Sequence, residues 1–164
     1  MKNIFYYFVE GECEKKLINT IKEQYIFSGK VYIKNITQKA IHKAMLRTFD
    51  KNGICVMIFD TDVLHSKEKI NKVLENKKVL DDNNIKYIFI YQDKNLEDEI
   101  VKSTNIKKIE DMFNVTIGKH KSKFIKCKNL LQKLKEIEFD VKKMWLFDKE
   151  ELPKNESYKI KKKK

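Results

Sequence analysis

Short runs of apolar and aromatic residues constrain the fold of this chain more than any other feature of its sequence. Ile4–Val9 (IFYYFV) and Ile54–Phe59 (ICVMIF) contain no other residue type, and Ile85–Tyr91 (IKYIFIY) is interrupted only by Lys86. Runs of this length are typical of strands that are buried on both faces, as the strands of parallel sheets are. We therefore predict a sheet whose inner strands are covered from both sides.

Segments in which apolar residues recur at helical spacing separate these runs. Leu17, Ile18 and Ile21 show this spacing and predict a helix over residues 12–26. The same spacing predicts helices over residues 38–49 and 66–80. Residues 30–36 alternate like a half-exposed or edge strand. Strands that alternate with helices of about a dozen residues indicate an α/β fold, here a mainly parallel four-stranded sheet with helices on both faces.

The chain beyond the fourth predicted strand is expected to be helical. Apolar spacing predicts helices over residues 96–101, 106–113 and 123–137, and leaves the type of the segment 141–147 open. One proline and four glycines give no linker that would divide the chain. We expect an α/β core over residues 1–104, a helical basic extension over 105–160 packed on that core, and a disordered lysine tail over 161–164.

The net charge of +12 is concentrated near the C-terminus, where residues 119–164 contain sixteen lysines and seven acidic residues. This excess predicts a polyanionic partner, nucleic acid before an anionic membrane. No apolar run approaches the roughly 20 residues of a membrane span, so we expect no membrane association. Three widely spaced cysteines without a CxxC pair indicate neither a zinc site nor a disulfide framework, and they favour a reducing cytoplasm.

Acidic residues follow three of the predicted strands. Glu10 comes after the first strand, Asp60 and Asp62 after the third, and Glu97 a few residues after the fourth. Open parallel sheets bind their ligands beyond the carboxyl ends of the strands. Two carboxylates spaced two residues apart in an extended segment point the same way, and they repel each other unless a cation lies between them. Hard oxygen donors of this kind suit Mg²⁺ or Mn²⁺.

The same residues have a structural interpretation. Acids after strands cap helices, and acids in a first helical turn complement the helix dipole, which by itself favours this role for Glu12 and Glu14. Asp60 and Asp62 fit a turn as well as a metal site. Taken alone, the acids at 97–99 favour a solvated helix start. Acids at three separate strand ends of a basic protein shift the balance towards a metal site.

The order of these residues resembles the Toprim (topoisomerase–primase) domain. Glu10-Gly11 and Glu14-Lys15 after one strand, followed by Asp60-Thr61-Asp62 after a later strand, match its two acidic motifs. The segment Val9–Ile18 (VEGECEKKLI) is most similar to the Toprim domains of OLD-type nucleases and of small RloB-like proteins. Leu96-Glu97 resembles a further acidic motif of the OLD-type enzymes. The resemblance covers roughly residues 4–100.

The resemblance implies phosphodiester chemistry with Mg²⁺ or Mn²⁺. Asp60 and Asp62 would hold the metal, Glu10 would ligate it or act as general acid and base, and Glu14 and Glu97 would complete a second metal site. A lysine near the metals would offset charge in the transition state. The candidates for this lysine are Lys123 and Lys126.

The basic segment at the start of the extension is a candidate track for nucleic acid. It contains Lys119, Lys121, Lys123, Lys126 and Lys128. These lysines are equally compatible with the solvated face of an amphipathic helix. The three histidines, including His120 within the segment, show no metal-ligand spacing.

These observations favour a metal-dependent nuclease that acts on DNA or RNA, with a role in defence against mobile elements implied by the resemblance. The alternatives are a non-catalytic nucleic-acid-binding module with a Toprim-like fold and an interaction subunit of a larger complex. The sequence contains no P-loop motif GxxxxGK[ST], so any ATPase would be a partner protein. A homodimer is the other partnership left open.

Overall fold

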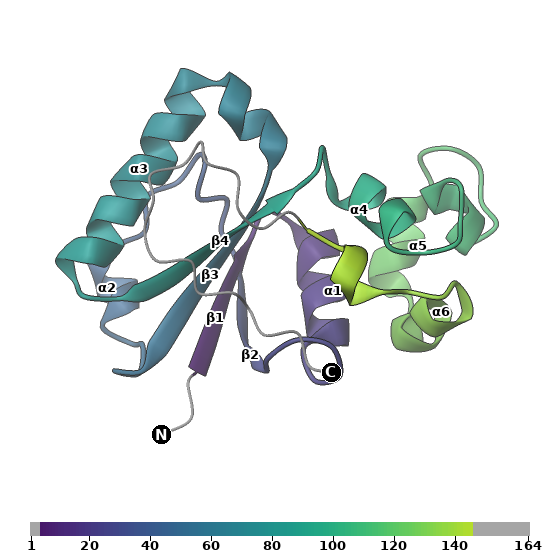
Figure 1. Cartoon of the computed structure of the whole chain (residues 1–164), viewed down its shortest axis with the longest axis horizontal. Coiled ribbons are helices and arrows are strands. Elements are labelled where there is room, and N and C mark those ends of the chain that lie inside the picture. Colours follow the sequence, from purple (N-terminus) through teal and green to yellow (C-terminus); the bar gives the residue numbers. More distant parts are fainter. Residues whose placement is uncertain (1–3, 146–164) are drawn as a thin grey trace.

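Four parallel strands form the centre of the protein (Figure 1). The structure is a computed structural model, and it describes residues 4–145 except for the side chains of residues 63 and 64. The strand order is β2-β1-β3-β4. The prediction of a parallel four-stranded sheet with helices on both faces is confirmed. The strands are β1 (Ile4–Val9), β2 (Gly29–Ile33), β3 (Gly53–Asp60) and β4 (Lys86–Gln92).

Helices cover the sheet in layers, and short 3₁₀ segments connect some of them. On one face lie α2 and α3, and on the other lie α1 and α4, with α5 and α6 packed against α1 (Figure 1). The helices are α1 (Glu12–Ile21), α2 (Lys43–Leu46), α3 (Lys67–Asp82), α4 (Leu96–Lys102), α5 (His120–Lys126) and α6 (Leu130–Glu136). The 3₁₀ segments are η1 (Thr61–His65), η2 (Ile109–Met112) and η3 (Val141–Lys143).

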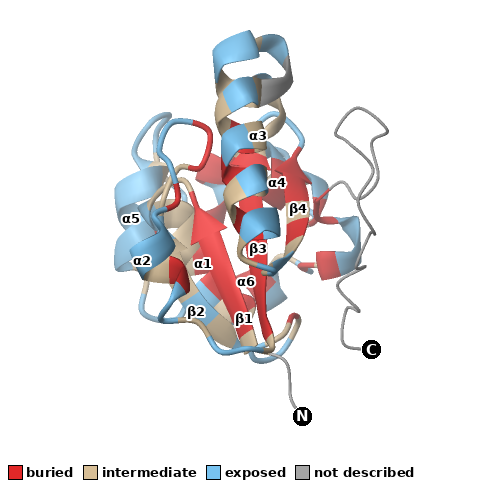
Figure 2. Cartoon of the chain, turned by 90° about the vertical axis from the view of Figure 1, so that its left-hand side faces the viewer, coloured by how far each residue is buried: buried red, intermediate tan, exposed pale blue. Residues whose placement is uncertain are grey.

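Alternate side chains of the strands enter two separate apolar cores. Tyr7 and Val56 point to the core beneath α1, which also receives Leu134 of α6, and we call it the α1-side core. Phe8 and Met57 point to the opposite core beneath α3, the α3-side core. Figure 2 shows the central strands β1 and β3 buried and the outer faces of the helices exposed. Burial on both faces explains why these strands contain almost no polar residues.

The helix predicted over residues 38–49 is wrong, because only α2 forms there. Asn76 of α3 is fully buried and its side chain bonds the backbone of the preceding segment. Its Oδ1 accepts from Ile41 N at 2.7 Å, and its Nδ2 donates to Ile36 O at 2.7 Å and to Lys39 O at 3.0 Å. These groups are thereby fixed in a non-helical path, so a tertiary contact overrides the apolar spacing.

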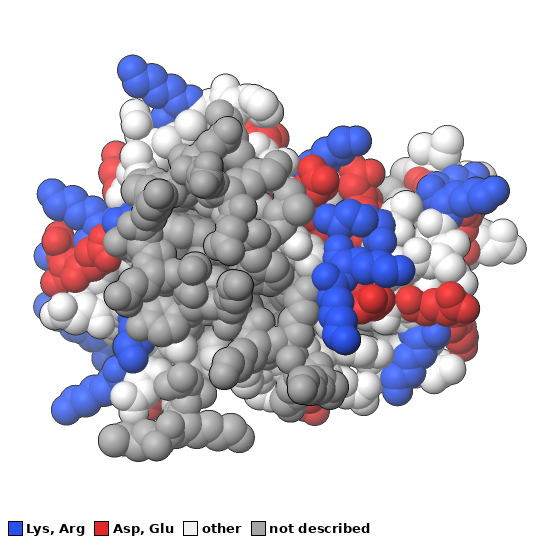
Figure 3. All heavy atoms as spheres, in the orientation of Figure 1, with Lys and Arg blue, Asp and Glu red and all other residues white. Residues whose placement is uncertain are grey.

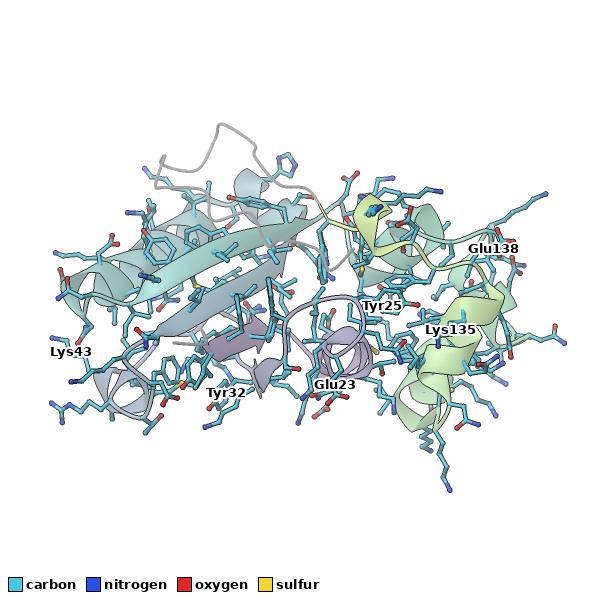
Figure 4. The ribbon with its side chains drawn as sticks, turned by 60° about the horizontal axis from the view of Figure 1, so that its bottom comes forward. Glu23, Tyr25, Tyr32, Lys43, Lys135 and Glu138 are labelled. Atoms are coloured by element: carbon cyan, nitrogen blue, oxygen red, sulfur yellow. The ribbon has the colours of Figure 1, made fainter. Side chains whose placement is uncertain are left out.

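The helix predicted over residues 12–26 ends at Ile21 instead. Tyr25, which continues the apolar spacing, contacts Phe139 edge to face with ring centroids 5.5 Å apart. Figure 4 shows Tyr25 between α1 and the helical extension. Its apolar character therefore serves a tertiary contact with the extension, and the helix is not continued.

The extension also differs from its predicted helices. The helix over 123–137 is divided into α5 and α6, because Cys127 has an extended backbone (φ −65°, ψ 114°). Phe124 and Leu130, on the two sides of this break, both enter the α1-side core. The segment 106–113 contains only η2. Residues 146–160 and the predicted tail lie outside the described residues. Within residues 4–145, no helix is long and apolar enough to span a bilayer.

Asn76→Ala is expected to destabilise the protein by about 2–4 kcal/mol, because it leaves a buried N–H and two carbonyl groups without their partner. The midpoint of urea unfolding, measured by circular dichroism, tests this. Asn19→Ala is the matched control, because Asn19 is exposed on α1, and we expect a change within about 0.5 kcal/mol. Equal effects of the two substitutions would contradict the role assigned to Asn76.

Candidate functional site

The five predicted metal-binding carboxylates lie close together at the carboxyl end of the sheet. Asp60 is the last residue of β3, and its pKa is raised by burial and then by the negative charges of the other four. Those four are Glu10, Glu14, Asp62 and Glu97. We call these five residues the carboxylate cluster. They come from the ends of β1 and β3, the first turns of α1 and α4, and η1.

Asp60 is the most constrained member of the carboxylate cluster. Burial, followed by the four neighbouring carboxylates, raises its pKa to about 7. Its Oδ1 atom is buried and has no hydrogen-bond partner. A buried acceptor without a donor costs free energy, so this oxygen is poised to accept an electropositive group.

Glu10 shares this electrostatic environment. Burial, then the charges of Glu14 and Asp62, raise its pKa to about 7, while the Lys69 ammonium lowers it in part. Two half-buried carboxyls that both titrate near neutral pH are unusual for acidic side chains. Perturbed groups of this kind are concentrated at functional sites of proteins.

Glu14 has a structural contact as well. Gly11 is the N-cap of α1, and the backbone N–H groups of Glu14 and Gly11 hydrogen-bond the Glu14 carboxylate. A Cβ atom at position 11 would lie 3.2 Å from Glu14 Oε2, so glycine allows this close approach. Burial nevertheless outweighs these bonds and raises the Glu14 pKa. Glu14, in the first turn of α1, therefore bonds backbone N–H groups at the start of the helix.

Asp62 is the exposed member of the carboxylate cluster. Its Oδ2 pairs with Lys69 Nζ at 2.6 Å, and its side chain is 60% exposed. Lys69 lies in the first turn of α3, where Ser66 caps the helix by accepting from Lys69 N. Lys69 was not predictable from the sequence, because its position beside Asp62 depends on how α3 packs against the sheet.

Glu97 is held by two groups from α5. Its Oε1 lies 3.2 Å from His120 Nε2 and 3.3 Å from Lys121 Nζ. The other ring nitrogen of His120, Nδ1, lies 3.1 Å from Oε1 of Glu110. Carboxylates only accept hydrogen bonds, so His120 donates to both partners only when both ring nitrogens are protonated. Burial raises the Glu97 pKa, but its own N–H, His120 and Lys121 outweigh burial and lower the pKa overall.

The basic segment reaches the carboxylate cluster through Lys121. Lys123 and Lys126 stay the predicted candidates for a lysine near the metals, and the lysine of this segment in contact with Glu97 is Lys121. Figure 3 shows lysine and arginine side chains interleaved with acidic ones on the described part of one face. Exposed lysines on and beside α5 are Lys119, Lys121, Lys123, Lys126 and Lys128.

The donor chemistry of the carboxylate cluster fits a hard divalent cation, since its ligands would be carboxylate oxygens and one of them lacks any hydrogen-bond partner. The side chains are not yet arranged around a common centre. Among residues 4–145, no group of three or more His, Cys, Asp or Glu side chains has a geometry that could hold a metal ion. Binding would therefore require side-chain rotations.

Comparisons with known proteins leave the family open. No protein-family model matches the chain, and neither a curated protein sequence nor a solved structure matches it. The resemblance to Toprim domains therefore rests on the quoted residues and stays a prediction. The sheet topology and the grouping of the carboxylates are structural findings that do not depend on it.

The free energy of unfolding is expected to fall as pH rises from about 4 to about 7. Glu10 and Asp60 have folded-state pKa values near 7, above their unfolded values near 4. The folded state therefore binds their protons more tightly, and the stabilisation is complete below pH 4 and lost by pH 7. Urea unfolding without divalent cations, at a series of pH values, measures this trend.

Asp60→Asn isolates the contribution of one carboxyl. The variant is expected to be less sensitive to pH in this window and more stable than the wild type at pH 8, because it removes a repelled charge. The matched control is Asp82→Asn, an exposed acid at the end of α3, which should leave the pH profile unchanged. A wild-type profile parallel to that of Asp60→Asn would show that Asp60 ionises normally.

Proposed function

We propose that this protein is a Mg²⁺- or Mn²⁺-dependent nuclease that cleaves phosphodiester bonds of DNA or RNA. The observation that carries the proposal is Asp60, a half-buried carboxyl at the ligand-binding edge of a parallel sheet. Its Oδ1 atom is buried without a hydrogen-bond partner, and four other carboxylates lie around it. A structural acid would normally have its buried oxygens paired with hydrogen-bond donors. This arrangement is instead suited to a divalent cation.

The residues of the chain have distinct roles in this proposal. Asp60 holds the cation, and Asp62, Glu14 and Glu97 extend the donor set. Bound divalent cations stabilise the charge that develops on the attacking and leaving oxygens of a phosphodiester. Glu10, whose pKa is about 7, can take up or release a proton near neutral pH.

Lysines beside the carboxylate cluster are suited to bind the substrate backbone. Lys121 contacts Glu97, and exposed lysines continue along α5. Ammonium groups bind phosphates without regard to base sequence. These lysines therefore favour a nucleic acid over a small phosphate ester.

One observation favours a non-catalytic nucleic-acid-binding module as the second candidate. Asp62 is paired with Lys69, and Glu97 with Lys121 and His120. Protein cations thus already neutralise two of the five carboxylates. If these pairs persist, the remaining donors hold a cation weakly or not at all.

The cellular setting forms part of the proposal. Three free cysteines, Cys13, Cys55 and Cys127, suit a reducing cytoplasm. The resemblance to OLD-type and RloB-like proteins suggests defence against mobile elements, with a partner ATPase or a second copy of the chain as assembly partner.

Mn²⁺ is expected to stabilise the wild type and not Asp60→Asn. At a concentration one hundred times the Kd, binding would raise the Tm by about 5–10 °C. Differential scanning fluorimetry with Mn²⁺, Mg²⁺ or K⁺ alone measures the shift. Asp82→Asn is the charge-matched control and should respond like the wild type. A wild-type Tm that does not respond to Mn²⁺ would remove the basis of the metal proposal.

Cleavage of nucleic acid is expected to require both the divalent cation and Asp60. Labelled single- and double-stranded DNA and RNA of fixed length are incubated with Mn²⁺ or with EDTA, and the products are separated on denaturing gels. Asp60→Asn should lower the rate by about 100-fold or more while retaining binding in a filter assay. Binding by the wild type without cleavage of any of the four substrates would favour the non-catalytic module.

A further inference from the structure

Gln92, the last residue of β4, carries a second buried oxygen without a partner. Its side chain is 1% exposed, and Oε1 has no hydrogen-bond donor. In the described part of the chain, three buried side-chain atoms lack partners: Asp60 Oδ1, Gln92 Oε1 and Trp145 Nε1. Two of the three are therefore acceptor oxygens at the ends of neighbouring strands.

The register of the sheet places these two residues side by side. Asp60 of β3 is aligned with Gln92 of β4 in a parallel pair. Ile58 and Ile90, two residues earlier in each strand, both point into the α1-side core. Because side chains alternate with a period of two, Asp60 and Gln92 point to that same face, just beyond the apolar core.

A buried amide oxygen normally accepts a hydrogen bond, since leaving it unpaired costs free energy. Asn76 of α3 shows the normal case, because both its side-chain oxygen and its side-chain nitrogen are hydrogen-bonded. The side-chain oxygen of Gln92 has no such bond, and neither has Oδ1 of the neighbouring Asp60. The simplest common cause is an electropositive group that both oxygens accept.

We propose that Gln92 supplies a neutral oxygen ligand to the divalent cation, beside Asp60 and on the α1 face of the sheet. This inference rests on the proposed function, because it assumes that the carboxylate cluster binds a cation. An amide carbonyl is a hard donor suited to Mg²⁺ and Mn²⁺. It contributes an oxygen without adding charge to carboxylates that already repel one another.

The position of Gln92 on the α1 face of the sheet separates the acids that share this face from the one that does not. Glu14 and Glu97 belong to α1 and α4, which cover the same face as Gln92. Asp62 is exposed and paired with Lys69 of α3, on the opposite face. The cation is therefore bound chiefly by Asp60, Gln92 and the acids of α1 and α4, and Asp62 contributes less.

Gln92→Met tests the proposal, because methionine preserves the length of the side chain and removes both polar atoms. Isothermal titration with Mn²⁺ gives the Kd, and scanning fluorimetry in EDTA gives the Tm without metal. We expect a Kd at least about tenfold higher, with a Tm in EDTA equal to or above that of the wild type. Gln132→Met on the exposed side of α6 is the matched control and should leave the Kd unchanged.

The two readouts separate a ligand from a structural residue. A Kd within about twofold of the wild type would overturn the proposal. A lower Tm in EDTA would also overturn it, because it would show that Gln92 is hydrogen-bonded in solution, for instance to the indole N–H of Trp145. Gln92→Glu keeps an oxygen donor at this position and adds a negative charge, so it is expected to bind Mn²⁺ while losing stability at pH 8 without metal.

Failure of the inference is distinguishable from failure of the proposed function. If the wild type binds Mn²⁺ and Asp60→Asn does not, the cation site stands, and an unaltered Kd in Gln92→Met removes only the glutamine ligand. If the wild type itself binds no Mn²⁺, the cation site and the glutamine ligand are both wrong.

Discussion

The repulsion among carboxylates at one edge of the sheet is the constraint on which the rest of the site depends. Parallel strands end on the same side, so residues far apart in sequence such as Glu10 and Asp60 meet there. Burial and then the charge of Glu10 raise the Asp60 pKa, while burial and the charges of Glu14 and Asp62 raise the Glu10 pKa. The two apolar cores provide the stability that tolerates this repulsion. Lys69, Lys121 and His120 reduce it by pairing with the outer acids. A divalent cation would reduce it further.

The sheet was predictable from the sequence because strands buried on both faces require continuous apolar runs. The helices were less predictable where tertiary contacts determine the backbone. The segment before α2 has helical apolar spacing, but the buried side chain of Asn76 bonds its backbone groups. Tyr25 continues the spacing of α1, but it packs against Phe139 instead. Spacing records which residues are buried and does not record what they are buried against.

The carboxylate cluster was predictable for the same topological reason. Acids directly after parallel strands meet at one edge whatever the loops do. Its cationic partners were not predictable, since Lys69 and His120 reach the acids only through the rotation and position of α3 and α5. Gln92 was not predictable as a ligand, because a glutamine at a strand end has no distinctive sequence signal. Its proposed role depends on its unpaired oxygen and on its position beside Asp60.

Asp60 and Glu10 have pKa values near 7 because both are partly buried and face other carboxylates. A bound divalent cation is expected to lower both values. Carbon-13 NMR of the labelled carboxyl groups, followed over pH with and without excess Mg²⁺, measures this directly. We expect pKa values of about 7 for both groups without Mg²⁺ and lower values with it. Ordinary values near 4 for both groups, or values that Mg²⁺ leaves unchanged, would contradict this expectation.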